Sequence, residues 1–228
     1  MALADQLRLM VITDPALLAG RDPVAACRAA VLGGATMVQV RGKDASVRDV
    51  VTLTRALIAE LAVPVLVNDR VDVALIAGAA GAHLGQDDVP LAAMRPHVPT
   101  GFILGISVGS PSEAERARAG HADYWSIGPC YATTTKADAG EPLGANGFAA
   151  LARLAPDVPV IGIGGITAAN ALAIVQSGAA GVAVIHAVLG AVDPRTAAAA
   201  VLEAVVTGRA GGAEGPSGSP RPVPSPRG

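Results

Sequence analysis

Short apolar runs recur between residues 7 and 188, and each is followed by a segment rich in alanine and leucine. The runs contain many β-branched residues and show little polar–apolar alternation, which is typical of parallel strands buried on both faces. They predict eight strands, at residues 7–14, 37–42, 63–69, 81–86, 103–109, 123–129, 158–166 and 181–188.

The intervening segments predict helices, for example over residues 46–62 and 111–120. Several begin with Pro or Ser and end at Gly, the residues preferred at the two ends of a helix. Strict alternation of eight strands with helices predicts the α/β class and a single closed (β/α)8 barrel, the TIM-barrel fold. An open doubly wound sheet is the alternative, because periodicity does not show closure, but the count of eight favours the barrel.

The C-terminal residues 209–228 differ from the rest in composition. Pro, Gly and Ser dominate them, and no apolar periodicity remains. Such a segment cannot bury enough surface to order itself. The sequence therefore predicts one catalytic barrel domain over residues 1–208 and a disordered tail over 209–228.

Composition narrows the classes of partner. The chain is 51% hydrophobic but only 2% aromatic, so its core must be built from Val, Ile, Leu and Ala. A net charge of -2, without a basic patch, argues against nucleic-acid or anionic-membrane partners. No apolar stretch approaches the roughly 20 residues of a membrane span. Cys27 and Cys130 form no disulfide framework or metal-ligand spacing, so we expect a soluble, cytoplasmic protein.

Polar residues and glycines gather where the predicted strands end. In a (β/α)8 barrel the chemistry lies at the C-terminal ends of the strands. The residues in question are Asp14, Gln39, Arg41, Lys43, Asn68, Asp69, Gln86, Asp87, Asp88, Ser107, Thr133, Thr134, Thr135, Lys136, Gly162, Gly164, Gly165 and His186. The residues before the strands are mostly Gly, Pro, Ala or Val, so the polarity belongs to one face.

This set suits phosphate groups and a hard cation. Cationic side chains, hydroxyls and glycine backbone N–H groups are all phosphate ligands. Asp69 and Asp88 offer hard oxygen ligands without His or Cys nearby in the sequence, which favours Mg²⁺ shared with a polyphosphate over zinc. One phosphate would need neither so many donors nor a metal. The pattern predicts two anionic groups, at least one of them a diphosphate.

The two lysines support this interpretation. Lys43 and Lys136 are the only lysines among 17 basic residues, and both follow predicted strands. A compact ammonium beside a metal-bound diphosphate is not interchangeable with a planar guanidinium. We therefore expect both to contact the diphosphate.

Structural roles compete with the functional ones at several positions. Asp69 could instead be the N-cap of the helix that follows it, and Asp14 a cap or a support for a site residue. His83 lies inside a predicted strand, where a hydrogen-bonded core residue is expected. Cys130 is expected to be a small core residue rather than a nucleophile.

Six stretches together resemble the thiamine-phosphate synthase family: "GGATMVQVRGKD", "LVNDRVDVALIAGAAGAHLGQDDVP", "LGISVGS", "ADYWSIGPCYATTTKADAG", "PVIGIGGI" and "GAAGVAVIHAV". They occur in the family's order over residues 11 to 188. The resemblance implies condensation of 4-amino-2-methyl-5-(diphosphooxymethyl)pyrimidine with a thiazole phosphate, which gives thiamine phosphate and pyrophosphate. It also implies Mg²⁺ and a possible homodimer.

The resemblance also implies the site residues. Those matching the pyrimidine diphosphate positions are Gln39, Arg41, Lys43, Asn68, Ser107 and Lys136, with Arg41, Lys43, Lys136 and Ser107 as the catalytic set. The Mg²⁺ ligands are Asp69 and Asp88. Those matching the thiazole phosphate positions are Thr133, Thr135, Gly164, Gly165, Ile185 and His186. His186 stands where the family usually has serine.

Two other functions remain open on the sequence. A thiazole tautomerase of the same barrel family would keep a phosphate site but need neither diphosphate nor metal. A non-catalytic phosphate-binding barrel would need no intact metal ligands. The joint presence of Asp69, Asp88, Lys43 and Lys136 argues against both.

Overall fold

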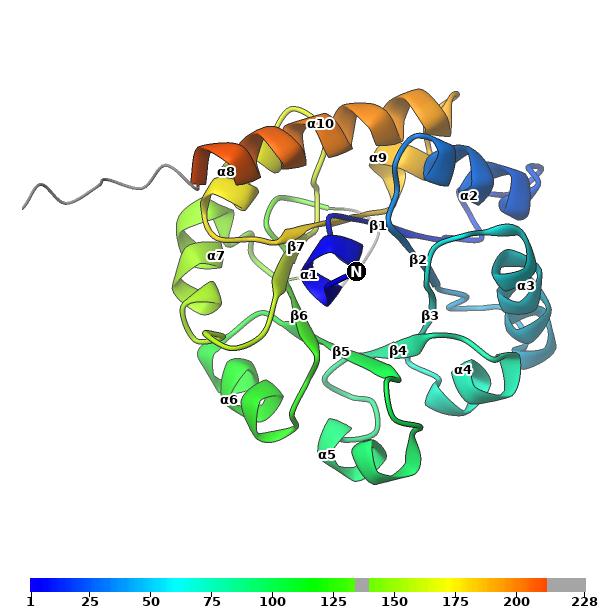
Figure 1. The fold of residues 1–228 in the computed structure, drawn as a ribbon, viewed down its shortest axis with the longest axis horizontal. Helices are drawn as coiled ribbons and strands as arrows, with labels where there is room; N and C mark the ends of the chain where they lie inside the picture. The colour runs from blue at the N-terminus through cyan, green and yellow to red at the C-terminus, as the bar shows by residue number, and fades with distance from the viewer. Residues whose placement is uncertain (134–139, 213–228) are drawn as a thin grey trace, which may run out of the picture.

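The strands close into a barrel. The computed structural model describes residues 1–133 and 140–212, and within them eight strands are each parallel to both neighbours. β1 pairs with β2 on one side and with β8 on the other, which leaves no free edge. Figure 1 looks down the barrel and shows the helices as an outer ring. The predicted (β/α)8 barrel is confirmed, and the open sheet is excluded.

All eight predicted strands are present, although each is shorter than the apolar run that predicted it. They are β1 (Leu9–Ile12), β2 (Met37–Val40), β3 (Val65–Asn68), β4 (Gly81–Leu84), β5 (Ile103–Val108), β6 (Tyr124–Ile127), β7 (Val160–Ile163) and β8 (Gly181–Val184). Apolar residues beyond the strand ends still pack in the core. Ile166 follows β7, and Val188 lies in the helix that follows β8, yet both are buried. Hydrophobicity therefore extends further than the hydrogen-bond ladder.

The helices follow the strands in the expected alternation. They are α1 (Leu3–Gln6), α2 (Pro23–Leu32), α3 (Val47–Glu60), α4 (Val71–Ala77), α5 (Leu91–Met94) with the 3₁₀ turn η1 (Arg95–His97), α6 (Pro111–Ala119), α7 (Gly144–Ala152), α8 (Ala171–Gln176), α9 (His186–Leu189) and α10 (Pro194–Gly212). Asp22, Ser46 and Ser110 cap α2, α3 and α6 by accepting hydrogen bonds from backbone N–H groups. No helix in the described ranges is long and apolar enough to cross a membrane.

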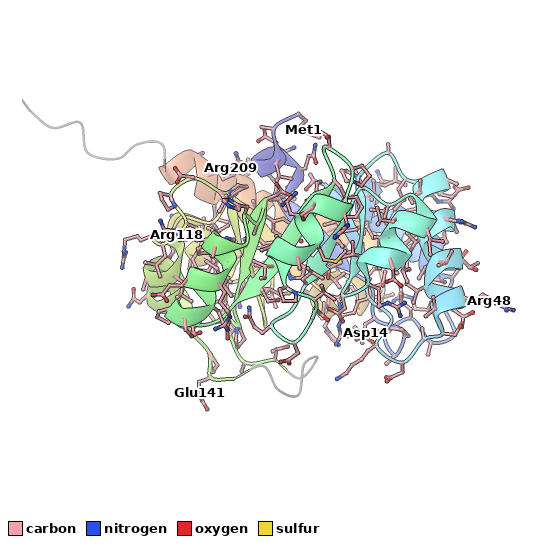
Figure 2. All side chains as sticks on the ribbon, turned by 90° about the horizontal axis from the view of Figure 1, so that it is seen from below. Met1, Asp14, Arg48, Arg118, Glu141 and Arg209 are labelled. Atoms are coloured by element: carbon pink, nitrogen blue, oxygen red, sulfur yellow. The ribbon has the colours of Figure 1, made fainter. Side chains whose placement is uncertain are left out.

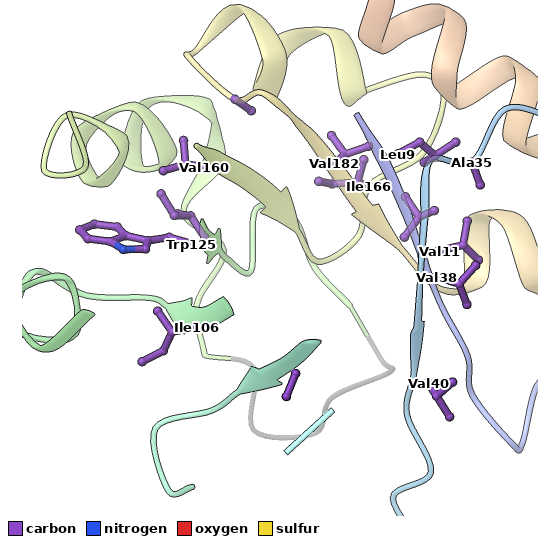
Figure 3. Close-up of a cluster of buried hydrophobic side chains, with 14 of the residues drawn as sticks. Leu9, Val11, Ala35, Val38, Val40, Ile106, Trp125, Val160, Ile166 and Val182 are labelled. Carbon is purple, nitrogen blue, oxygen red and sulfur yellow. The ribbon is translucent and has the colours of Figure 1, made fainter. Parts of the chain in front are cut away.

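Apolar side chains form two separate cores. The larger lies between the barrel and its helices and contains Trp125, Val160 and Val182 (Figure 3). The smaller fills the lumen and is built from Met10, Leu66 and other inward-facing residues of the strands. Because neighbouring residues of one strand face opposite sides, the strands other than β4 contribute to both cores, and the residue between Ala82 and Leu84 of β4 is the polar His83.

The two ends of the barrel differ. The short helix α1 lies across one end, as Figure 1 shows, and Leu3 packs against the lumen core there. Figure 2 places Met1 at that end and Asp14, which follows β1, at the opposite end. The C-terminal ends of the eight parallel strands therefore meet at the end without α1. We call this end the mouth.

The chain stays helical slightly beyond the predicted end of the domain. Helix α10 runs to Gly212, four residues past the boundary placed at residue 208. Arg209 explains the extension, because its guanidinium lies 3.2 Å from Asp5 Oδ1 and also donates to the carbonyls of Ala4 and Ala180. Composition alone does not reveal these contacts. The rest of the predicted tail, residues 213–228, lies outside the described residues.

Candidate active site

The mouth brings the predicted site residues together. Those within the described residues lie at or just beyond the ends of seven strands: Gln39, Arg41, Lys43, Asn68, Asp69, Asp88, Ser107, Thr133, Gly164, Gly165, Ile185 and His186. Because all the strands are parallel in one closed barrel, their C-terminal ends share one face. Thr135 and Lys136 lie outside the described residues, so their predicted roles stay predictions.

Arg41 is held in place by the end of β1. Its Nη1 lies 3.4 Å from Asp14 Oδ2, and the Arg41 side chain is only 16% exposed. Asp14 Oδ1 accepts the backbone N–H of Ala16 at 2.9 Å, so Asp14 both caps its loop and supports Arg41. The backbone N–H of Arg41 donates to Thr13 Oγ1 at 2.9 Å. Sequence reasoning missed Thr13, which the structure buries; a threonine before Asp14 at the end of the first apolar run was the available signal.

Asp69 has an unusual backbone. Its φ is 64°, in the left-handed region that residues other than glycine rarely occupy. Its N–H donates to the carbonyl of His83 at 2.7 Å, which ties the end of β3 to β4. The N-cap of α4 is Arg70, so the N-cap alternative for Asp69 is wrong. Strain held in this way is common at functional sites.

Asp88 is held at the end of the neighbouring strand. Its Oδ2 accepts the backbone N–H of Gly85 at 2.6 Å, and the residue is half-buried while Asp87 is exposed. Within the described ranges no group of three or more His, Cys, Asp or Glu residues could hold a metal. Two carboxylates suit a cation that takes its remaining ligands from water and substrate phosphates, as Mg²⁺ does. The residues present therefore fit Mg²⁺ better than a protein-enclosed metal.

A hydrogen-bonded chain joins three neighbouring strands, β4 to β6, in the lumen below the mouth. His83 Nε2 lies 3.1 Å from Ser107 Oγ, and His83 Nδ1 lies 2.9 Å from Tyr124 Oη. We call Tyr124–His83–Ser107 the lumen relay. It confirms His83 as a hydrogen-bonded core residue and includes one predicted substrate ligand, Ser107. Another predicted ligand, Gln39, is buried, and its Nε2 donates to Met10 Sδ at 3.4 Å.

Burial raises the pKa of Tyr124 far above its usual value, so the phenol of the lumen relay stays protonated. A phenol and a serine hydroxyl each donate and accept, so either tautomer of His83 completes the relay.

Sequence reasoning missed Tyr124. The sequence feature that could have pointed to it is its position. Tyr124 is one of two tyrosines in a chain poor in aromatic residues, and it lies near the start of a predicted strand. The ring is accommodated because residue 105 is glycine, where a Cβ atom would overlap the phenol. That cross-strand fit depends on the β5–β6 register, which places Gly105 beside Tyr124.

The loops after β6 and β7 lie against each other. Cys130 N donates to the Ile163 carbonyl at 2.7 Å, and Tyr131 N donates to the Gly164 carbonyl at 2.9 Å. Gly165 has a φ of 62°, and a Cβ atom there would overlap the Ala132 carbonyl. Glycine therefore allows the segment leading into Thr133 to approach the turn after β7.

His186 begins the short helix α9 and is exposed. Its ring lies alongside Gly190, since a Cβ atom at residue 190 would be 3.1 Å from His186 Nε2. Ile185, the preceding residue, packs against the lumen core. The histidine thus stands at the mouth, with its backbone anchored by its neighbour.

The two cysteines are not nucleophiles. Both are fully buried, and burial raises the pKa of each thiol to about 12, with Asp22 adding to the effect at Cys27. Cys130 Sγ donates to the Ile127 carbonyl at 3.4 Å. The expectation that Cys130 is a core residue is confirmed.

Taken together, the closed (β/α)8 barrel and the cations and carboxylates at its mouth are typical of barrel enzymes, whose active sites lie at the C-terminal ends of the strands. A sequence model described as "Thiamine monophosphate synthase" matches residues 9–188, most of the chain. The chain belongs to this family, and it is a transferase of thiamine biosynthesis.

Individual proteins similar to this chain over most of its length carry the same family name. The chain is 46% identical over 203 residues to a thiamine-phosphate synthase of Chloroflexus aurantiacus, covering 88% of this chain and 93% of the relative. It is 45% identical over 206 residues to a thiamine-phosphate synthase of Xanthobacter autotrophicus, covering 89% of this chain and 97% of the relative. Among solved structures, a thiamine phosphate pyrophosphorylase from Pyrococcus furiosus superposes with a TM-score of 0.82 at 36% identity, covering 91% of this chain and all of that one.

The thiol pKa values lead to a prediction. At pH 8 both thiols are protonated and buried, so iodoacetamide should leave Cys27 and Cys130 unmodified in the folded protein. The same reagent in guanidinium chloride should modify both, which serves as the control. Mass spectrometry gives the count. Fast modification of the native protein would contradict the burial described.

Proposed function

We propose that the chain joins 4-amino-2-methyl-5-(diphosphooxymethyl)pyrimidine to a thiazole phosphate with the residues gathered at the mouth. The thiazole nitrogen forms a bond to the exocyclic methylene carbon. The carbon–oxygen bond to the diphosphate breaks, and pyrophosphate leaves with the electron pair. The observation that carries this proposal is the placement of Arg41, Asp69 and Asp88 at the ends of three consecutive strands.

The diphosphate subsite is assigned to the ends of β2 to β4. Arg41 is pre-positioned by Asp14, so it needs little reordering to meet an anion. Lys43 is exposed two residues further on. Lys136 is assigned to the same group by family resemblance. Charge builds on the leaving group as the carbon–oxygen bond breaks, and these cations would stabilise it.

Mg²⁺ is assigned to Asp69 and Asp88. When bound, it would neutralise charge on the leaving diphosphate, whose oxygens would complete its coordination. Asp69 is oriented by its backbone bond to His83, and Asp88 by the N–H of Gly85. Asn68, the last residue of β3, is assigned to the diphosphate beside them.

The thiazole phosphate subsite is assigned to the opposite side of the mouth. Thr133 lies in the segment that packs against the glycine turn after β7, while Ile185 follows β8 and His186 begins α9. Backbone N–H groups and hydroxyls are suitable neutral phosphate ligands there. His186 would contribute a ring N–H in place of a serine hydroxyl. Thr135 completes the set by resemblance.

No covalent intermediate is needed. A dissociative departure of pyrophosphate calls for charge stabilisation rather than a nucleophilic side chain. The protonated, buried thiols of Cys27 and Cys130 agree with this chemistry. Two further expectations stay predictions: a homodimer, from the resemblance, and a cytoplasmic location, from the cysteine usage.

The first prediction concerns the metal. With both substrates and Mg²⁺ the protein should form thiamine phosphate, detected by mass spectrometry, and EDTA should abolish the product until Mg²⁺ is restored. Product undiminished in EDTA would refute the metal role. No product under any condition would favour the tautomerase or the non-catalytic barrel, and a tautomerase would isomerise a thiazole phosphate without the diphosphate.

The two carboxylates allow a matched comparison. Asp69→Asn should lower kcat by at least about 10²-fold, because one anionic ligand is lost. Asp72→Asn is the control: Asp72 lies nearby on α4 but pairs with Arg70 at the surface, so its activity should be near normal. Equal effects of the two substitutions would remove Asp69 from the metal site.

A third prediction concerns Lys136. Lys136→Ala should lower kcat by about 10²–10³-fold, the usual cost of one preorganised charge-stabilising donor. The melting temperature should not change. Lys136→Arg should recover only part of the rate, because a planar guanidinium does not replace a compact ammonium. Near-normal kinetics of Lys136→Ala would contradict the assignment.

A further inference from the structure

Ser126 is the one described residue with a fully buried side-chain polar atom that lacks a hydrogen-bond partner. It lies in β6, it is 3% exposed, and its Oγ contacts no donor or acceptor of the described chain at hydrogen-bonding distance. A buried hydroxyl without a partner destabilises a folded protein, whereas alanine at the same place would carry no such cost. The position therefore calls for an explanation.

The Ser126 side chain faces the lumen. Its neighbours Trp125 and Ile127 belong to the outer core, and Tyr124, two residues before it, belongs to the lumen core. Side chains alternate along a strand, so Ser126 shares the face of Tyr124. The register places it beside Ser107 on β5 and Ile161 on β7. Ser126 is thus one step nearer the mouth than Tyr124.

The polar side chains around Ser126 already have partners. Tyr124, His83 and Ser107 are joined in the lumen relay, and Gln39 donates to Met10 Sδ. The β5–β6 register sets Ser126 beside Ser107, so the two hydroxyls are neighbours at the end of the relay. The lumen residues below them, such as Met10 and Leu66, are apolar.

We infer that Ser126 is a specificity-determining residue, whose hydroxyl binds the polar edge of the substrate's aminopyrimidine ring beside Ser107. This inference rests on the proposed function. An aminopyrimidine has an apolar face and an edge on which a donor amino group adjoins an acceptor nitrogen. A serine hydroxyl both donates and accepts, and so suits that edge. The lumen core below Ser126 is apolar, so it suits the ring of the substrate better than its diphosphate.

The test is kinetic and uses Ser126→Ala. Loss of one neutral hydrogen bond should raise KM for the pyrimidine diphosphate by about tenfold, equivalent to about 1.4 kcal/mol. KM for the thiazole phosphate should not change. The melting temperature should stay the same or rise, because the hydroxyl has no partner in the free protein. Calorimetric binding of the pyrimidine diphosphate gives the same comparison without turnover.

Thr54→Val is the matched control. Thr54 is also a buried hydroxyl, but its Oγ1 donates to the Val50 carbonyl at 2.7 Å within α3. This substitution should lower the melting temperature and leave both KM values unchanged. The two variants thus separate a hydroxyl that binds ligand from one that holds the fold.

Three results would overturn the inference. An active wild-type protein with an unchanged KM in Ser126→Ala would remove the ligand role while leaving the proposed function intact. A lower melting temperature with unchanged KM would show that the hydroxyl serves the fold through a buried water. Wild-type protein that neither binds the pyrimidine diphosphate nor turns it over would remove the proposed function and the inference together.

Discussion

Closure of eight parallel strands is the constraint on which the site depends. Most of the strands are only four residues long, so each makes few backbone hydrogen bonds to its neighbours. The closed barrel leaves none of them at an edge. Closure also sends every C-terminal strand end to one mouth. Residues as distant in sequence as Asp14 and His186 are brought to one face by this geometry rather than by direct attraction.

The lumen has an apolar part and a polar part. Apolar side chains fill the end covered by α1, while the lumen relay and Ser126 introduce polar groups towards the mouth. Beyond them come the charged residues, among them Arg41 held by Asp14. Polarity therefore rises along the barrel axis. That gradient suits a substrate with an aromatic ring at one end and a diphosphate at the other.

The sequence predicted most of this plan because the fold has a strong repeat. Eight apolar runs were enough for the barrel, and the strand-end rule then collected Arg41, Asp69 and Asp88 on one face. What it could not predict depends on contacts between strands. Tyr124 in the lumen relay requires the β5–β6 register and the space at Gly105.

The hydrophobic pattern also could not predict the boundaries of strands and helices or the local backbone geometry. Apolar runs extend past the strands because loops and helices bury the extra residues, as Ile166 does. The left-handed backbone of Asp69 has no signature in residue type, since aspartate there reads equally well as a helix cap. The extension of α10 rests on the contacts of Arg209 with the first residues of the chain.

Calorimetric titration of pyrophosphate into the protein tests the central claim most directly, namely that the mouth holds a diphosphate through a metal and fixed cations. The account predicts that pyrophosphate binds in the presence of Mg²⁺ and that EDTA lowers its affinity at least about tenfold. Arg41→Ala should lower the affinity further. Equal affinity with and without Mg²⁺, or affinity unaffected by Arg41→Ala, would contradict it.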